Sequence, residues 1–158
     1  MQKKLQAKLY RKYPELFQDR KKPGSETRMC DGICCDDGWY ELIDDVCLQL
    51  QFINQQYNAL YTFFQIKEKL GGLRLYINQP AVYGYPLSKK IKVVISKMVH
   101  CIKHFAECQS YCTCEQCGGY RHGSKVIGTW IHALCDKCWE EFKKENKIVS
   151  KKKRINKR

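Results

Sequence analysis

Apolar residues recur every three or four positions in two long stretches of the chain, residues 39–60 and residues 87–108. In the first stretch the recurring positions are Trp39, Leu42, Ile43, Val46, Leu50, Ile53, Tyr57 and Leu60. In the second they are Ile91, Val94, Ile95, Met98, Ile102 and Phe105, with the outward positions held by Lys89, Lys90, Lys92, Lys97 and Lys103. This spacing predicts two long helices, each with one buried face.

A β-hairpin is predicted between these two helices. Residues 61–69 and 73–78 alternate apolar and polar side chains around Gly71-Gly72, a dipeptide suited to a tight turn. Before the first long helix, the apolar positions of residues 5–17 predict an amphipathic helix that is interrupted near Pro14. The expected fold class is therefore α+β, with two long helices against a small antiparallel sheet.

Two pairs of cysteines with C-x2-C spacing follow the second long helix. Cys114 and Cys117 form the first pair, and Cys135 and Cys138 form the second. This spacing is typical of a structural zinc site, in which four thiolates surround one ion and leave no position for a reactive water. We therefore predict that these residues bind zinc and that the metal stabilises the fold. Cys112 is the alternative first ligand, although its C-x4-C spacing fits less well.

The segment around these cysteines predicts a small zinc finger. Residues 118–122 and 125–132 flank Gly123-Ser124, which predicts a hairpin with its turn at that dipeptide. The second cysteine pair opens a helix that carries acids early and lysines late, as the helix dipole favours. A knuckle, a hairpin and a ligand-bearing helix resemble a treble-clef finger, and a zinc ribbon is the competing form. His122 and His132 are expected in strands or turns rather than as ligands.

The other seven cysteines are expected to be reduced. Eleven thiols, a basic start without a signal peptide and no apolar run long enough to cross a bilayer predict a cytoplasmic protein without membrane association. Cys101 and Cys108 fall on the apolar stripe of the second long helix and are predicted to be small core residues. A further hypothesis is a second metal site that joins His100 or His104 to Cys30, Cys34, Cys35 and Cys47.

The net charge of +13 is concentrated at the two ends of the chain. Residues 1–22 hold eight Lys and Arg against two acids, and residues 143–158 hold nine against one, so the rest of the chain is close to neutral. A like-charge block is typical of a disordered tail that contacts phosphate groups, and a solubilising tail is the alternative. The candidate nucleic-acid-binding residues are Lys151, Lys152, Lys153, Arg154, Lys157 and Arg158.

These patterns divide the chain into four parts. Residues 1–22 form a basic amphipathic N-terminal helix region, and residues 23–111 form the α+β core. Residues 112–146 form the zinc-finger module, and residues 147–158 form the basic tail, which is expected to be disordered.

Three sequence motifs follow one another along the chain. They are DDGWYELI at residues 36–43, QIKEKLGGLRLY at residues 65–76, and the cysteine segment with Gly118 after its first pair and Trp130 before its second. Over about residues 10–140 the chain resembles these small phage and prophage proteins, from which it departs by the extra cysteines at 30, 34 and 35. The resemblance implies a viral setting in a host bacterial cytoplasm and no particular activity.

One enzymatic hypothesis comes from acidic residues upstream of the hairpin. Asp36, Asp37, Asp44 and Asp45 precede Gln65-Ile66-Lys67, an order similar to that of the acids and the lysine of metal-dependent nucleases. Exposure to solvent explains Asp44 and Asp45, which fall inside a predicted helix. Lys67, Glu68 and Lys69 can pair across the hairpin as ordinary surface charge.

We therefore favour a non-enzymatic, zinc-containing phage protein that binds or inhibits a host or defence protein complex. The motif residues predicted to form its polar patch, with one aromatic anchor, are Asp37, Trp39, Lys67, Glu68 and Arg74. The alternative partner is nucleic acid, gripped by the basic ends, for which aromatic stacking faces are offered by Tyr76, Tyr83, Tyr85 and Trp130.

Overall fold

The computed structural model of the chain describes residues 1–80 and 86–146, so the basic tail, Tyr83 and Tyr85 lie outside it. The helices in these residues are α1 (Lys3–Lys12), α2 (Tyr40–Tyr57), α3 (Lys89–Ser110) and α4 (Asp136–Glu145). The strands are β1 (Ile33–Cys34), β2 (Thr62–Lys69), β3 (Gly72–Asn78), β4 (Lys125–Ile127) and β5 (Trp130–His132). Short 3₁₀ helices cover Gln18–Lys21, Met29–Asp31 and Asp37–Trp39. This mixture of helices and small sheets confirms the α+β class.

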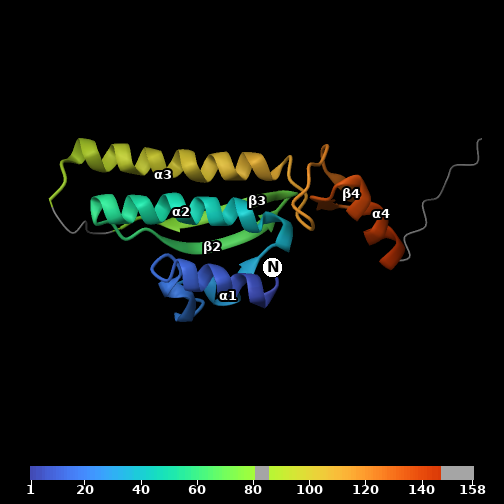
Figure 1. Cartoon of the computed structure of the whole chain (residues 1–158), viewed down its shortest axis with the longest axis horizontal. Coiled ribbons are helices and arrows are strands. Elements are labelled where there is room, and N and C mark those ends of the chain that lie inside the picture. The colour runs from blue at the N-terminus through green and yellow to red at the C-terminus, as the bar shows by residue number, and fades with distance from the viewer. Residues whose placement is uncertain (81–85, 147–158) are drawn as a thin grey trace, which may run out of the picture.

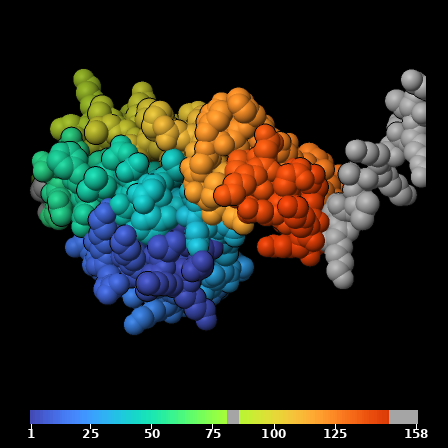
Figure 2. Space-filling view, turned by 45° about the vertical axis from the view of Figure 1, so that its right-hand side comes forward, coloured from blue at the N-terminus to red at the C-terminus, as the bar shows by residue number. Residues whose placement is uncertain are grey.

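The elements are arranged in layers around a three-stranded sheet. Figure 1 shows α2 and α3 side by side and antiparallel above the sheet, with α1 below it. The segment from β4 to α4 lies at one end of this domain. Figure 2 shows the same segment, in orange and red, against the end of the domain.

The sheet has the order β1-β2-β3. The predicted hairpin is present, with Ile66 opposite Leu75 in antiparallel register, and its turn residues Leu70 and Gly71 both have positive φ. The third strand, β1, was not predicted and pairs parallel to β2, so the sheet is mixed rather than purely antiparallel. A two-residue strand is too short for an alternating pattern, which is why the sequence did not indicate it.

The core lies between α2, the sheet and the N-terminal segment. The predicted buried face of α2 is confirmed at Ile43, Val46, Leu50 and Ile53. On the opposite face of the sheet, Phe17 stacks on Phe63 with ring centroids 5.1 Å apart. The helix α1 ends before Pro14, as predicted, and the chain continues in turns that bring Leu16 and Phe17 into the same core.

The predicted buried face of α3 is confirmed at Ile95, which is buried, and at Ile102, which packs against the core, but it is wrong at the other four positions. Ile91, Val94, Met98 and Phe105 are exposed, and so are Cys101 and Cys108, which therefore are not core residues. The buried residues of this helix are Ile95, Val99, Ala106, Glu107 and Ser110.

The physical reason for the different face is the position of α3 at the free edge of β3. The Glu107 carboxylate accepts a hydrogen bond from the backbone N–H of Leu75 (2.9 Å), and the Ser110 hydroxyl accepts one from the N–H of Leu73 (2.9 Å). Because unpaired backbone donors are costly to bury, the helix turns these polar side chains inward.

Candidate metal centre

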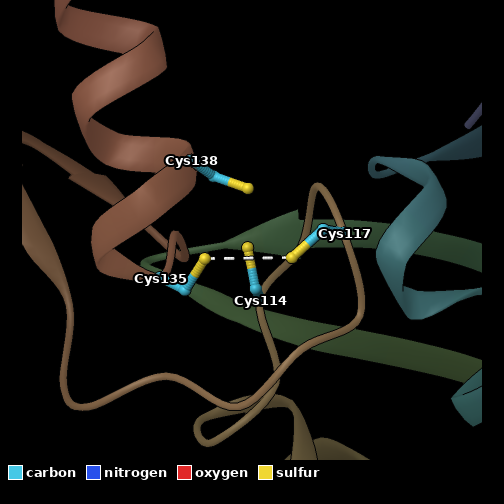
Figure 3. Close-up of side chains that lie close together, drawn as sticks. All are labelled: Cys114, Cys117, Cys135 and Cys138. Atoms are coloured by element: carbon cyan, nitrogen blue, oxygen red, sulfur yellow. Dashed lines mark hydrogen bonds between the residues drawn. The ribbon is translucent and has the colours of Figure 1, made fainter.

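The four cysteines of the two C-x2-C pairs come together in one cluster. Cys114 and Cys117 lie in the turn that follows α3, Cys135 is the N-cap of α4, and Cys138 lies in the first turn of that helix. All four sulfur atoms are within 4.8 Å of one another, and those of Cys117 and Cys135 are 3.8 Å apart. Figure 3 shows the sulfurs converging on a common centre, so the cluster could hold one metal ion.

Backbone hydrogen bonds shape the first knuckle. The N–H of Cys114 donates to the carbonyl of Gly119 (2.7 Å), and the N–H of Gly118 donates to the carbonyl of Cys114 (2.9 Å). Gly118 has φ +75°, a conformation that glycine adopts without strain. This tight loop aims the sulfurs of Cys114 and Cys117 at the start of α4.

The environment of the thiols favours a cation between them. Burial raises the pKa of Cys114 and of Cys138, whereas the backbone N–H of Cys138 lowers the pKa of Cys135 to about 7. Several thiolates this close together repel one another, and a positive ion at their centre removes that penalty. The donor set therefore fits a metal that prefers sulfur ligands.

The residues between the two pairs fold differently from the prediction. The hairpin consists of β4 and β5, and its turn is at Gly128-Thr129 instead of Gly123-Ser124. Residues 118–122 do not form one of its strands, because they turn back onto the first knuckle. There Tyr120 forms a bridge with Thr113, and the N–H of Arg121 donates to the carbonyl of Cys112 (2.8 Å).

The alternative ligands lie outside the cluster. His132 is part of β5, where its ring centroid is 4.8 Å from that of Phe142. His122 packs edge-on against Tyr120, and Cys112 is exposed. The prediction that the histidines are strand or turn residues is therefore consistent with their positions.

The second metal site is contradicted by the structure. Across residues 1–80 and 86–146, the only group of three or more candidate ligands that comes together is the C-terminal cysteine cluster. Cys30 and Cys34 are exposed, whereas Cys35 and Cys47 are buried and burial raises the pKa of both thiols. Cys35 and Cys47 belong to the hydrophobic core, so packing explains their positions.

The DGW motif contacts the first cysteine knuckle directly. The N–H of Gly38 donates to the carbonyl of Glu115 (2.7 Å), and a Cβ atom at Gly38 would overlap backbone atoms of Cys114, Glu115 and Gly118. Trp39 is fully buried, and its indole N–H donates to the carbonyl of Thr113 (3.0 Å). Trp39 therefore cannot be the exposed aromatic anchor that was predicted.

The remaining residues of the predicted patch each have an intramolecular contact. The Asp37 carboxylate accepts from the N–H of Gln2 (2.7 Å), and the Glu68 carboxylate accepts from the N–H of Gly71 (2.5 Å). Arg74 donates to the hydroxyl of Tyr111 (2.6 Å). The Lys67 ammonium lies 5.5 Å from the ring centre of Tyr76. These contacts give the motif residues a structural explanation that does not need a partner.

Arg121 was not identified from the sequence, although it is the most connected side chain of this region. It is buried, and its guanidinium donates to the carbonyls of Gly71 (2.7 Å), Ser110 (3.0 Å), Thr113 (3.1 Å) and Gly123 (2.5 Å). One side chain thus links the turn of the β2–β3 hairpin, the end of α3 and the loop after the first knuckle. An arginine is expected at the surface by default, so only its tertiary partners could reveal this role.

The aspartates of the nuclease hypothesis are found in separate contacts. The Asp44 carboxylate forms an ion pair with Lys12 (2.7 Å), and the backbone N–H of Asp36 donates to the carboxylate of Glu115 (3.0 Å). Burial raises the pKa of Glu115 to about 7. Asp45 is exposed on α2.

A groove of about 730 Å³ is lined by residues of both β3 and α3. Its floor includes Leu75 and Val99, and its lining also includes Tyr76, Lys97 and His100.

Comparison of the chain with protein-family models, with curated proteins and with solved structures produced no match. In the part of the chain that the structure describes, no helix has both the length and the apolar character needed to cross a membrane.

Proposed function

We propose that this chain is a zinc-stabilised binding protein, in which the metal fixes a small module onto the α+β core. The observation that carries the proposal is the convergence of four cysteine sulfurs. Four thiolates complete the tetrahedral coordination of zinc and leave no position for a water or a substrate. A metal held in this way stabilises structure, so the proposed activity is recognition and not catalysis.

One sulfur–sulfur separation in the cluster matches that expected for zinc. Zinc–sulfur bonds of about 2.3 Å in a regular tetrahedron place the sulfurs about 3.8 Å apart. The sulfurs of Cys117 and Cys135 are 3.8 Å apart. The order of knuckle, β4–β5 hairpin and α4 supports a treble-clef arrangement, because the second ligand pair sits at the start of a helix rather than on a second hairpin.

The first test is the metal content. The purified chain is expected to contain one equivalent of zinc, and Cys117→Ser is expected to lose it and to unfold the segment after α3. Structural zinc in finger peptides contributes about 10–16 kcal/mol of apparent binding free energy at neutral pH, far more than this module could replace by packing. Cys112→Ser is the matched control, because Cys112 is exposed and outside the cluster. A zinc-free chain with an unchanged melting temperature would reject the proposal.

We further propose that the partner is a protein of a bacterial host or of its defence systems. The resemblance to phage proteins supports this setting. Capture of the tagged chain's partner from host lysate is expected to survive nuclease treatment.

The competing nuclease hypothesis predicts cleavage of DNA or RNA with magnesium or manganese that is lost in Lys67→Ala, whereas our proposal predicts that both nucleic acids stay intact.

A second candidate function is nucleic-acid binding, and α1 favours it. This ten-residue helix contains no acidic residue. Its exposed basic side chains are Lys3, Lys4, Lys8, Arg11 and Lys12. Such a basic face, next to phosphate, gains affinity by counterion release. The salt dependence of partner binding distinguishes nucleic-acid binding from protein binding.

A further inference from the structure

The exposed apolar residues of α3 form a regular stripe. Ile91, Val94, Met98 and Phe105 are 42%, 55%, 38% and 64% exposed. Cys101 and Cys108 are exposed as well and complete a series with steps of three, four, three, four and three residues. This is the spacing of the a and d positions of a coiled coil, sustained over three heptads.

The stripe is separate from the packing of α3 within the chain. The helix contacts α2 and β3 through Ile95, Val99 and Ala106, which lie on a different face. The helix therefore has one apolar face that is covered by its own chain and a second that is not. In the view of Figure 2, α3 (yellow-green to light orange) forms the upper margin of the molecule, and no described segment covers it from above.

The neighbouring helix α2 widens this apolar surface. Phe105 borders a shallow groove between the two helices, and on the α2 side the groove is bordered by Asp45 and Gln49. Phe52 is seven residues, or about two turns, beyond Asp45, so it lies on the same side of α2. Phe52 is itself exposed. Several large apolar side chains exposed along two neighbouring helices are more typical of an interaction site than of a solvated surface.

The charges beside the stripe indicate the nature of the occupant. Lys90, Lys97 and His104 each immediately precede an a-type residue, which places them at the g positions that flank a coiled-coil seam. The only acidic residue of α3 is Glu107, which is buried and paired with Lys103. A second copy of α3 packed antiparallel would place these g positions opposite one another, and no acidic residue at the g positions of α3 would offset the charges of Lys90 and Lys97. A helix with acidic flanking residues would neutralise the charges of these two lysines.

We propose that the stripe Ile91, Val94, Met98, Cys101, Phe105 and Cys108 is the docking surface for an amphipathic helix of a partner protein, whose apolar seam is flanked by Asp or Glu. This inference rests on the proposed function, because it locates the surface through which the binding protein recognises its partner. The helix would lie along α3 and complete the apolar packing that the chain itself leaves open.

The probe is a pair of labelled three-heptad peptides with leucine at the a and d positions, one with Glu and one with Lys at the e and g positions. Fluorescence anisotropy with the full zinc-loaded chain is expected to show binding of the Glu peptide, and at least about tenfold weaker binding of the Lys peptide, as charge matching at flanking positions requires. Equal binding of the two peptides, or binding of neither, overturns the proposal.

Adjacent valines provide a matched pair of variants. Val94 belongs to the stripe, whereas Val93 is 46% exposed on the same helix but outside it. Val94→Asp is expected to weaken binding of the Glu peptide by at least about tenfold, the effect of losing an apolar contact at an interface centre, and Val93→Asp by less than about twofold. Lys97→Glu is expected to shift the preference toward the Lys peptide. Circular dichroism checks that each variant keeps its helices. Equal losses of peptide affinity in Val94→Asp and Val93→Asp would contradict the assignment of the stripe as the docking surface.

Two further measurements separate this inference from the proposed function. Sedimentation of the chain alone is expected to give a monomer, and a dimer that Val94→Asp dissociates would assign the stripe to a second copy and overturn the proposal. Partner capture that is zinc-dependent but unaffected by Val94→Asp rejects the stripe and leaves the proposed function in place. Absence of zinc rejects the proposed function itself, whatever the peptides do.

Discussion

Gly38 couples the α+β core to the C-terminal cysteine module through its lack of a side chain. The knuckle backbone from Cys114 to Gly118 approaches so closely that the N–H of Gly38 reaches the carbonyl of Glu115 (2.7 Å). The side chain of its neighbour Trp39 is buried in the core, and the indole N–H donates to the carbonyl of Thr113, next to the knuckle. The DGW motif is thus a docking element for the cysteine knuckle.

Replacing Gly38 with alanine is expected to destabilise the chain by about 1–3 kcal/mol, the usual effect of overpacking, because the new Cβ meets backbone atoms that cannot rotate away. Urea denaturation followed by tryptophan fluorescence measures the loss. Gly24→Ala is the control, since a Cβ there would meet only side-chain atoms at 3.7 Å or more. Equal denaturation midpoints for the two variants would contradict the argument.

Arg121 provides a second residue-scale test. Lysine keeps the charge but has a single ammonium, which cannot reach the four carbonyls that the guanidinium satisfies. Arg121→Lys is therefore expected to cost about 1–3 kcal/mol for each buried carbonyl that loses its partner, and to loosen zinc binding. Arg11→Lys on the exposed face of α1 should leave both properties unchanged. Wild-type zinc retention against a chelator in Arg121→Lys would show that this network is not what holds the module.

At the scale of elements, the sequence correctly predicted the helices and strands whose apolar residues are compatible with only one buried face. The helix α2 and the β2–β3 hairpin were predicted with their buried faces, because their apolar positions point to a single core. The helix α3 has two apolar stripes, and the stripe with the more regular spacing is the exposed one. The pattern alone could not show that the buried face is selected by Glu107 and Ser110 at the edge of β3.

The contact between α3 and the edge of β3 can be tested by hydrogen exchange of individual backbone amides. Glu107→Ala is expected to remove the acceptor for the Leu75 N–H, to cost about 1–3 kcal/mol, and to speed hydrogen exchange of that amide. Glu107→Gln keeps an acceptor oxygen and should retain most of the protection. The amide of Ile66, within the strand ladder, is the internal reference. Equal exchange of Leu75 in the wild type and in Glu107→Ala would refute the role of this side chain.

The four cysteines of the candidate metal site could be predicted from the sequence, whereas the fold of the residues around them could not. C-x2-C pairs have a local spacing that directly encodes ligand geometry, so all four cysteines were identified from the sequence. The turn of the second hairpin was misplaced, because both Gly123 and Gly128 adopt positive φ and only the bridge between Thr113 and Tyr120 decides which one closes the hairpin. Contacts between distant segments have no such local signal.

At the scale of the whole molecule, the three sequence motifs meet at one junction. Gly38 and Trp39 contact the knuckle, and Arg121 joins that segment to Gly71 in the turn of the hairpin motif. The motif residues therefore explain how the C-terminal cysteine module is attached to the core. A partner surface has to be sought elsewhere, and the exposed stripe of α3 and the basic ends are the two places that the structure and the charge distribution offer.

The basic ends give the prediction that separates a protein partner from nucleic acid. Residues 147–158 contain seven Lys and Arg and no acid. If the tail contacts phosphates, its deletion should weaken binding to a DNA duplex and reduce the magnitude of the log–log salt slope, by as much as about 6 if every charge contacts a phosphate. The melting temperature should not change, because the deletion begins after the last helix of the described core. The matched control replaces the seven basic residues with glutamine and keeps the length of the chain. If both forms bind DNA as the wild type does, the tail is not a nucleic-acid grip, and the proposals that remain are DNA binding through the basic face of α1 and recognition of a protein through α3.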